Sequence, residues 1–452
     1  MQLRALIQTV LLALGAVSLL AQAAPPPAPT APQNSSQISP QASSQTLPQT
    51  APLVWTWDNV KENFKINNPT LLAGFLNIDE LKAQEITANL RPNPDFSLSA
   101  DGTQIAPSRG VWQPFAGTFI SPSVSYLFER RHKRGLRFEA AKEGTAVGVA
   151  QQSDLERTLI FNLRTAFVGV LQAKAVLRLS QENLEYYDKI LKVSRDRYDA
   201  GDIAQIDLDR LELQRLQYES DLQTALVNLR TNKINLLALL NDRRPVDSFD
   251  LDGAFDFSES ILSLDDYRKD ALNERPDLRA AVLSEKQAET SYKLAQANGS
   301  TDPTVAVWYT HNGSFNNPDA LNTIGASVSI PLRIFDKNQG EKLRTKIDIT
   351  RNQRLRDAAE AQVYSDVDSA YATLTSNLAL LRPYKQKYLA QAVHVRDTIQ
   401  FSYQHGGASV LDFFNAESDY RTVELSYVNL VGAYLTAAAQ LDEAVGREVI
   451  IP

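Results

Sequence analysis

Four segments of the chain alternate polar and apolar residues, which is the period of a β-strand with two different faces. The alternation is clearest in 123–128 and 324–330, and weaker in the expected partner strands, 96–100 and 304–310. Small polar residues occupy one face and bulky apolar residues the other, which indicates a sheet with a wet side and an apolar side. An ordinary surface sheet over a soluble core would show the same pattern, so the strands alone leave both interpretations open.

Much longer segments carry apolar residues at helical spacing. Residues 136–198 contain no proline, and at about 1.5 Å per residue a single helix would reach roughly 95 Å. The return segment, 203–240, carries leucine at heptad-like spacing, and 340–403 with 409–446 repeats the pair. Pro383 lies inside the third of these segments, where a missing N–H should kink the helix. Helices of this length fit a coiled-coil rod or the wall of an elongated tube.

The two halves of the chain are copies of one design, the first over 55–250 and the second over 251–452. Each copy consists of a first helix (57–90 or 264–297), two strands, a very long helix, a tight glycine turn and a shorter helix. An ordered run of matches between the copies predicts an internal duplication. An offset of 205 residues places Tyr198 on Tyr403, Gly201 on Gly406, Asp207 on Asp412, and Glu212 on Glu417.

The first 23 residues have the order of a secretory signal peptide. Arg4 precedes an apolar run over 11–21, and Ala21-Gln22-Ala23 provides a small-residue cleavage site. An uncleaved anchor helix is the alternative. Residues 24–54 hold eight of the 21 prolines among Ala, Ser, Gln and Thr, which predicts an extended linker. No other stretch has 18 consecutive apolar residues, so we expect no further membrane-spanning helix.

Composition and charge narrow the range of functions. The formal net charge of −7 argues against non-specific nucleic-acid binding, which needs clustered basic surface. The chain has no cysteine, which excludes disulfides, thiolate metal sites and cysteine nucleophiles. The four histidines fall at no ligand spacing, and no nucleophile elbow, phosphate-binding glycine loop or dinucleotide fingerprint occurs. We therefore expect no enzyme, no cofactor and no bound metal.

Four strands are too few to cross a membrane alone. A lipid-exposed sheet edge leaves N–H and C=O groups without partners, and a small barrel needs about eight strands to close. If the sheet lies in a membrane, several chains must contribute strands to one barrel, and their helix pairs would close a second cylinder beneath it. The inside of such a tube is wet, so the small polar face would line the pore: Ser123, Ser125, Ser327 and Ser329.

Several local patterns recur in the same order in both halves. They are Asn67-Asn68-Pro69 with its counterpart Arg275-Pro276-Asp277-Leu278, Arg91-Pro92-Asn93-Pro94 before the first strand, Pro331-Leu332 with Phe335-Asp336 and Gly340, and the tip pattern of Tyr, Gly, Asp and Glu. Together they resemble the TolC-type outer-membrane factors, the exit ducts of tripartite efflux pumps and type I secretion systems. The resemblance covers residues 55–446.

The resemblance implies a mostly α-helical fold with a membrane β-barrel. It implies a homotrimer in which four β-strands per chain build a twelve-stranded barrel in the outer membrane, above a long α-helical barrel in the periplasm. The implied partners are a periplasmic adaptor protein, an inner-membrane pump and outer-membrane lipid, with no nucleic acid. The alternative from another class is a non-pore periplasmic coiled-coil adaptor or scaffold protein, which the long helical hairpins alone would support.

The resemblance also assigns functions to the two hairpin turns. Gly201-Asp202 and Gly406-Gly407 would be the tips that dock the adaptor, where small residues permit close backbone approach. Glycine at a helix C-cap with positive φ suits these turns whatever the function. Asp412 matches a family position whose carboxylates form a ring at the periplasmic aperture, where mutual repulsion would raise their pKa values. A simple cap on the returning helix is the alternative for Asp412.

The other aperture residues depart from the family pattern. Asn415 replaces a second acid, so the ring should carry less charge in the second copy. In the first copy, Asp207 and Asp209 stand beside Arg210, and a local ion pair would neutralise part of their charge. Tyr403 matches a tyrosine that latches the closed tip in some relatives, but the arginine that partners it there is absent here.

A basic run, 130–134 followed by Arg137, lies between a strand and the long helix of the first copy. We interpret it as a solvated junction. Contact with anionic lipid head groups is the alternative, because clustered Lys and Arg at a membrane surface attract such lipids.

Overall fold

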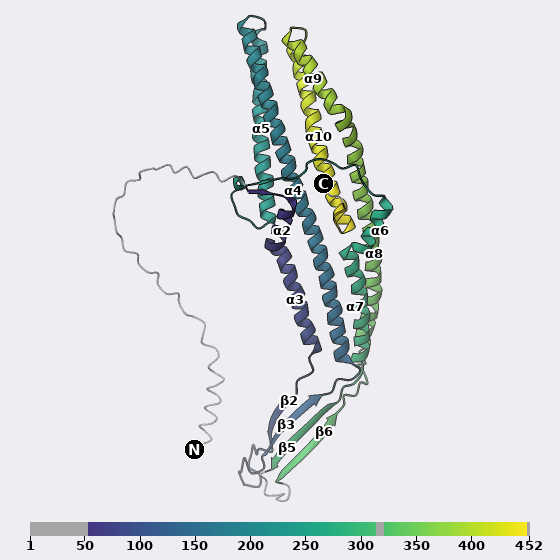
Figure 1. Cartoon of the computed structure of the whole chain (residues 1–452). Coiled ribbons are helices and arrows are strands. Elements are labelled where there is room, and N and C mark those ends of the chain that lie inside the picture. The colour runs from purple at the N-terminus through teal and green to yellow at the C-terminus, as the bar shows by residue number, and fades with distance from the viewer. Residues whose placement is uncertain (1–52, 313–320, 450–452) are drawn as a thin grey trace, which may run out of the picture. The chain divides into compact units, whose positions relative to one another are not determined.

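The computed structural model describes residues 53–312 and 321–449. The expected signal peptide, 1–23, and all but the last two residues of the expected linker, 24–54, lie outside this part. The described elements repeat one order twice (Figure 1). The first copy contains β1 (Leu53–Trp55), α2 (Trp57–Asn67), α3 (Pro69–Asn89), β2 (Asp95–Asp101), β3 (Phe119–Leu127), α4 (Lys133–Asp199), α5 (Gln205–Leu239) and the 3₁₀ turn Val246–Ser248. The second contains β4 (Phe249–Leu251), α6 (Leu264–Glu274), α7 (Pro276–Asn298), β5 (Thr304–Asn312), β6 (Asn322–Ser329), α8 (Gln339–Pro383), α9 (Leu389–Gln404) and α10 (Val410–Val445).

The first repeat begins two residues earlier than the sequence predicts. Leu53 and Val54 already belong to β1, which pairs in parallel with β4. The pairing buries apolar surface, because Trp55 is only 7% exposed and its ring lies 5.0 Å from that of Phe249. The expected boundary between the repeats, at 250 and 251, therefore falls inside β4, which pairs with the strand at the start of the first repeat.

The first helix of each copy is two helices, where the sequence analysis expected one. The breaks fall at Asn68 and Arg275, whose backbones are extended, with ψ of 117° and 121°. Each of these residues precedes a proline, and the proline ring disfavours the helical conformation of the residue before it. Pro69 and Pro276 then start the next helix, at a position where a missing N–H costs nothing.

The two break residues also anchor the end of the returning helix of their own repeat. The Asn68 side chain donates to the carbonyl of Leu239, at the end of α5, over 2.9 Å. The Arg275 guanidinium donates to the carbonyl of Ala444, near the end of α10, over 3.2 Å, and pairs with Asp277 and Asp366. Both satisfy carbonyl groups that a helix terminus leaves without an intrahelical partner.

The long helices form as the apolar periodicity predicts. α4 contains 67 residues, and α5 returns antiparallel along it (Figure 1). In the second repeat the long helix is interrupted where proline was expected to kink it: α8 ends at Pro383, and a π-helical turn, Tyr384–Tyr388, precedes α9. By length and composition α4 is apolar enough to cross a membrane, with a mean hydropathy of 1.3 over 18 residues. Its apolar stripe is nevertheless covered by protein, since Leu163 and Val170 are fully buried.

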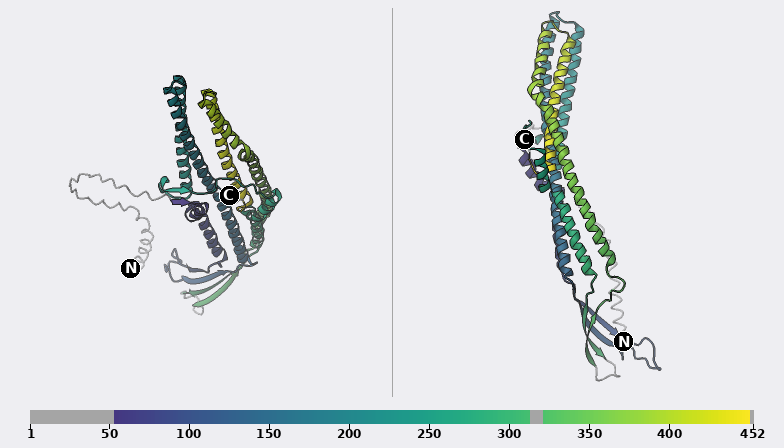
Figure 2. Two further views of the ribbon diagram at one scale, coloured as in Figure 1. Left: turned by 45° about the horizontal axis from the view of Figure 1, so that its top comes forward. Right: turned by 90° about the vertical axis from the view of Figure 1, so that its right-hand side faces the viewer.

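The four longer strands form one antiparallel sheet in the order β2-β3-β5-β6. β2 and β6 are its two edges, so neither pairs with a further described strand. The sheet lies at one end of the long helices, and the two hairpin turns, between α4 and α5 and between α9 and α10, lie at the other (Figures 1 and 2). The two candidate regions of function are therefore separated by the length of the helices.

Candidate functional site

The register of the sheet sorts its residues onto two faces. Cross-strand partners share a face, and Ser123 lies opposite Trp308, Ser125 opposite Ala306, Ala306 opposite Ser327, and Thr304 opposite Ser329. The four serines expected to line a pore therefore lie on one face of the sheet. Phe119, Leu127 and Trp308 are large side chains on the same face, and the Trp308 ring lies over Gly325, where a Cβ would be 2.3 Å from it.

The opposite face of the sheet is apolar and uncovered. Its large side chains are Phe96, Leu98, Ile120, Val124, Val307, Ile324 and Val328, of which Ile324 is 81% exposed and Phe96 70%. Exposed apolar area of this extent marks a surface that another protein or a membrane covers. One sheet thus presents an apolar face and a face of small polar residues to two different environments.

Both hairpin turns close on a glycine in the left-handed conformation. Gly201 has φ +85° and Gly406 has φ +75°, as the C-cap argument predicts. The following N–H reaches back five residues in each turn, from Asp202 to Arg197 over 2.9 Å and from Gly407 to Ser402 over 2.8 Å, which is the Schellman arrangement. Both glycines and both following residues are exposed, and no atom lies within 4 Å of a Cβ built on Gly201 or Gly406.

In the first turn, the predicted ion pair forms. Arg210 lies 3.6 Å from Asp207, one turn away on α5, and both side chains are partly exposed. Asp209 instead accepts a hydrogen bond from Gln205 over 2.8 Å. The charge of Asp207 is therefore partly balanced within the first hairpin, and Asp209 keeps its charge at the surface.

In the second turn, Asp412 caps the start of α10. Its carboxylate accepts from the backbone N–H and the hydroxyl of Ser409, over 3.0 and 2.7 Å, and its own N–H donates to that hydroxyl. These bonds hold the pKa of Asp412 below its ordinary value, opposite to the increase expected from repulsion around a ring. In the single chain, the cap therefore dominates the state of Asp412. Asn415 lies one turn further along and is exposed.

Tyr403 is buried, unlike the other residues expected at the aperture. It is 5% exposed, and its ring stacks on that of Phe413 at 5.3 Å. The Arg197 guanidinium of the first hairpin lies 5.3 Å from the same ring and donates to the Tyr403 carbonyl over 2.9 Å. Tyr403 therefore joins the two hairpins of one chain, and its hydroxyl is buried with no hydrogen-bond partner among the described residues.

Tyr403 belongs to a buried group that we call the tip cluster. It draws residues from both hairpins: Tyr187, Ile190, Leu191, Leu208, Leu211, Tyr218, Tyr403, Val410 and Phe413. Burial of this apolar surface holds the second hairpin against the first. Figure 2 shows the two hairpins running side by side toward their turns.

Glu417 lies just beyond the tip cluster, and its burial was not predicted from the sequence. Glu417 is 3% exposed, and its Oε1 has no hydrogen-bond partner among the described residues. Burial raises its pKa to about 7, although the guanidiniums of Arg396 and Arg421 oppose this increase. The tip pattern places a Glu at the same position of both hairpins. The packing of the hairpins is what buries Glu417 and leaves Glu212 exposed.

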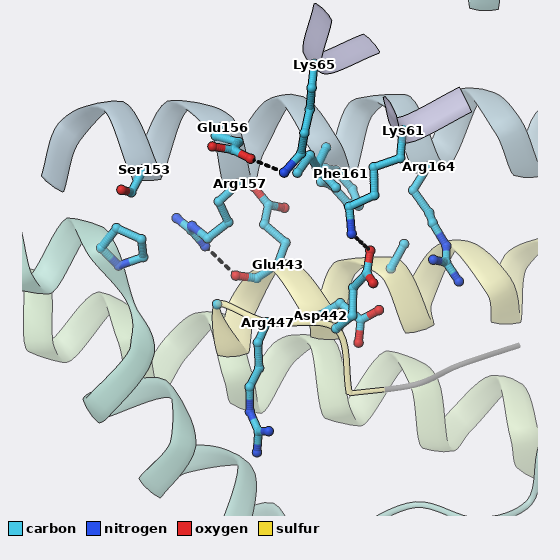
Figure 3. Close-up of a pocket in the computed structure, with 15 residues that line it drawn as sticks. Lys61, Lys65, Ser153, Glu156, Arg157, Phe161, Arg164, Asp442, Glu443 and Arg447 are labelled. Carbon is cyan, nitrogen blue, oxygen red and sulfur yellow. Dashed lines mark hydrogen bonds and ion pairs between the residues drawn. The ribbon is translucent and has the colours of Figure 1, made fainter. Parts of the chain in front are cut away.

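A cavity lies between the two repeats, where α2 and α4 of the first face the end of α10 of the second (Figure 3). It measures about 330 Å³ and is lined by α2, α4, the start of α7, the end of α10 and residues 446–448. Its charges largely match each other, since Lys65 pairs with Glu156 and Lys61 with Glu448, each over 2.7 Å. Over the described ranges, no group of three or more His, Asp or Glu side chains is arranged to hold a metal ion.

Comparisons with known proteins agree with this arrangement. A family model described as outer membrane efflux protein matches residues 62–242 and again 267–447, one match in each repeat. The cobalt-zinc-cadmium resistance protein CzcC of Cupriavidus metallidurans is 22% identical over 408 residues, which is 84% of this chain and 87% of that protein. The outer membrane protein TolC of Escherichia coli is 21% identical over 416 residues, 86% of this chain and 81% of that protein.

The fold also matches solved outer-membrane channels. The open state of the Neisseria gonorrhoeae MtrE outer membrane channel aligns with a TM-score of 0.71 at 18% identity, covering 87% of this chain and 89% of that one. The expected resemblance to TolC-type factors is thereby confirmed. Because the family model matches most of the sequence and both of its halves, the chain belongs to the outer membrane efflux protein family.

Proposed function

We propose that three copies of this chain form the exit duct of a tripartite efflux pump or type I secretion system. The four-stranded sheets would lie in the outer membrane and the helical hairpins in the periplasm. The observation that carries the proposal is the sheet itself, with two open edges and an uncovered apolar face. Membership of an outer-membrane family supports this over the alternative of a soluble scaffold, which leaves the apolar face unexplained.

The open edges fix how the copies would meet. In lipid every backbone N–H and C=O needs a partner, so β6 of one copy would pair with β2 of the next. Three copies would give twelve strands, enough for a barrel that encloses a channel. The apolar face would then contact lipid, and Ser123, Ser125, Ser327 and Ser329 would line the pore.

The hairpin turns would be the entrance for substrates. Their exposed glycines, Gly201 and Gly406, would meet a periplasmic adaptor protein together with Asp202 and Gly407. Small residues at these positions allow the close backbone approach that tip-to-tip docking requires. An inner-membrane pump would supply the energy, and this chain would act as a passive conduit without a catalytic step.

Conductance tests the proposal directly. The purified protein should insert into a planar bilayer and give stepwise currents, and its native mass should be that of three copies. A matched control is a chain with Val124→Asp and Ile324→Asp, which places charge on the apolar face and should prevent insertion. A monomer, or a trimer that carries no current, would contradict the proposal.

The aperture assignment is tested with a variant that separates charge from capping. Asp412→Asn keeps an oxygen that accepts from Ser409 and removes the negative charge, so α10 should remain capped. If the three Asp412 carboxylates line the constriction, the variant should lose cation preference in the reversal potential. Asp207→Asn, at the position that Arg210 already balances, should change it less. An unchanged reversal potential would remove Asp412 from the aperture.

A further inference from the structure

Cations gather where the four-stranded sheet meets the helices. Two loops lead from the sheet into long helices, 128–132 before α4 and 330–338 before α8, and they meet around the turn at 299–302 (Figure 1). On one side, Lys133 donates to the Ser300 carbonyl over 2.9 Å and to Asp302 over 2.6 Å. On the other, a Cβ on Gly299 would lie 2.4 Å from the Lys342 ammonium. The basic residues of both repeats therefore form one surface, which we call the junction patch.

The acids of this region already have partners. Glu129 is bound by Arg137, Asp302 is bound by Lys133, and Asp336 accepts the Asn338 N–H over 2.8 Å. This corrects part of the interpretation as a solvated junction, because Lys133 is only 4% exposed and Arg137 is paired. Six cations of the junction patch form no ion pair with any described residue: Arg130, Arg131, Arg134, Arg333, Lys337 and Lys342. A chain of net charge −7 thus carries a local excess of positive charge here.

Large apolar side chains project beside these cations. Phe335 is 90% exposed, Leu332 80% and Ile334 65%, all in the loop before α8. Phe128 continues the apolar face of the sheet on the other side, where its ring meets that of Tyr126 at 4.8 Å. Exposed apolar groups adjacent to unpaired cations suit the boundary of a membrane, where acyl chains and phosphates lie a few ångströms apart.

We infer that the junction patch binds the phosphate of anionic glycerophospholipids in the inner leaflet of the outer membrane. The inference rests on the proposed orientation, with the helices in the periplasm. Guanidinium groups such as those of Arg130 and Arg131 bind phosphate through paired hydrogen bonds, and Phe335 and Leu332 would enter the acyl region. A second copy related by a two-fold axis would bring the same cations together and leave them unneutralised, whereas phosphate neutralises them.

Native mass spectrometry of the detergent-purified protein tests this with an equimolar mixture of phosphatidylglycerol and phosphatidylethanolamine. The unaltered protein should retain several-fold more phosphatidylglycerol. A variant with Arg130→Gln, Arg131→Gln and Lys337→Gln should lose that preference. The matched control, Lys189→Gln, Lys192→Gln and Arg243→Gln, removes three exposed cations that also lack ion pairs among the described residues and should keep it.

Equal retention of the two lipids by the unaltered protein, or an unchanged preference in the triple variant, would overturn the inference. In a second measurement with equimolar lipid A and phosphatidylglycerol, stronger retention of lipid A would overturn the assignment to the inner leaflet. Loss of the oligomer in the triple variant with its lipid preference intact would place a second copy at the patch instead. Conductance of the triple variant in a bilayer of phosphatidylethanolamine tests the proposed function independently of lipid binding. Normal currents there would support the channel even if the lipid inference failed.

Discussion

The two hairpin tips carry the same residue pattern in different surroundings. Glu212 of the first tip is exposed and pairs with Arg195 over 2.8 Å. Glu417, its counterpart in the second tip, is 3% exposed and leaves one oxygen without a described hydrogen-bond partner. Duplication has therefore preserved the residue and changed its chemistry. The first carboxylate lies in an exposed ion pair, and the second is buried, which raises its pKa to about 7.

The difference arises from how the hairpins pack. Residues of both hairpins surround Glu417, including Tyr186 and Tyr218 of the first and Arg396 of the second. Glu212 is exposed on α5 and accepts from Arg195 of the neighbouring helix over 3.1 and 2.8 Å. The second hairpin thus buries Tyr403, Phe413 and Glu417 against the first. We expect it to be the hairpin that moves when the tip opens.

The largest effect should come from the apolar contact between the hairpins. Phe413 is fully buried in the tip cluster, so Phe413→Ala should cost about 3–5 kcal/mol of local stability. Hydrogen exchange of backbone amides near the start of α10 measures this opening. Leu213→Ala is the control, because Leu213 is 71% exposed and its removal should change exchange little. Equal acceleration in both variants would show that the tip cluster does not hold the second hairpin.

The second prediction concerns pH. The pKa of Glu417 rises from an ordinary 4.5 to about 7 in the packed tip, so packing favours the neutral acid. The stability that this provides is complete at low pH and is lost as pH rises toward 7, a difference of about 3 kcal/mol above neutrality. Glu417→Gln should abolish most of this dependence in hydrogen exchange between pH 5 and 8. Glu424, which is half-buried and whose pKa burial also raises, retains its own part of the dependence.

The matched control for the pH prediction is Glu212→Gln, at the equivalent position of the first tip. Because Glu212 is exposed, this variant should keep the pH dependence of the unaltered protein. The other charged groups that act on Glu417 are Arg396, Asp397 and Arg421. A flat profile in the unaltered protein would contradict the assignment of Glu417 as the titrating group.

The sequence predicts the features that depend on short periods. Alternation over a few residues assigned the faces of the strands, as Ser123 and Ser327 illustrate, and apolar spacing identified the long helices. The positive φ of Gly201 and Gly406 followed from helix C-cap chemistry alone. The helix break at Asn68 was also predictable, because a proline follows this residue. The helical pattern on both sides of it nevertheless favoured one continuous helix.

The burial of Glu417 and Tyr403 was not predictable in the same way. Both lie on helices whose local pattern permits either face to point outward, and their exposure is decided by contact between segments about 200 residues apart, such as Arg197 with Tyr403. Tyrosines at 186, 187, 218 and 420 were the available signal, since aromatic rings concentrated near two tips favour a shared interior. The burial of these two residues was not predictable because the segments that cover them are far away in the sequence.

The third prediction separates an interior role of Tyr403 from a latch. Its hydroxyl is buried without a partner among the described residues, so Tyr403→Phe should stabilise the tip by about 1 kcal/mol or leave it unchanged. A latch that depended on this hydroxyl would instead be lost, and the tip would open. The control is Tyr198→Phe in the first hairpin, where the ring is partly exposed. Faster exchange in Tyr403→Phe alone would restore the latch interpretation.

The smallest effect on stability should come from the ion pair of Glu212 in the first tip. Arg195 and Glu212 are 56% and 46% exposed, so their ion pair competes with water and salt. A double-mutant cycle with Arg195→Gln and Glu212→Gln should give a coupling energy of about 0.5 kcal/mol or less in hydrogen exchange, decreasing at higher salt. A coupling of several kcal/mol would mean that the first tip is held as firmly by charge as the second is by packing. The two hairpins would then be equivalent, and the expectation that the second one moves would fail.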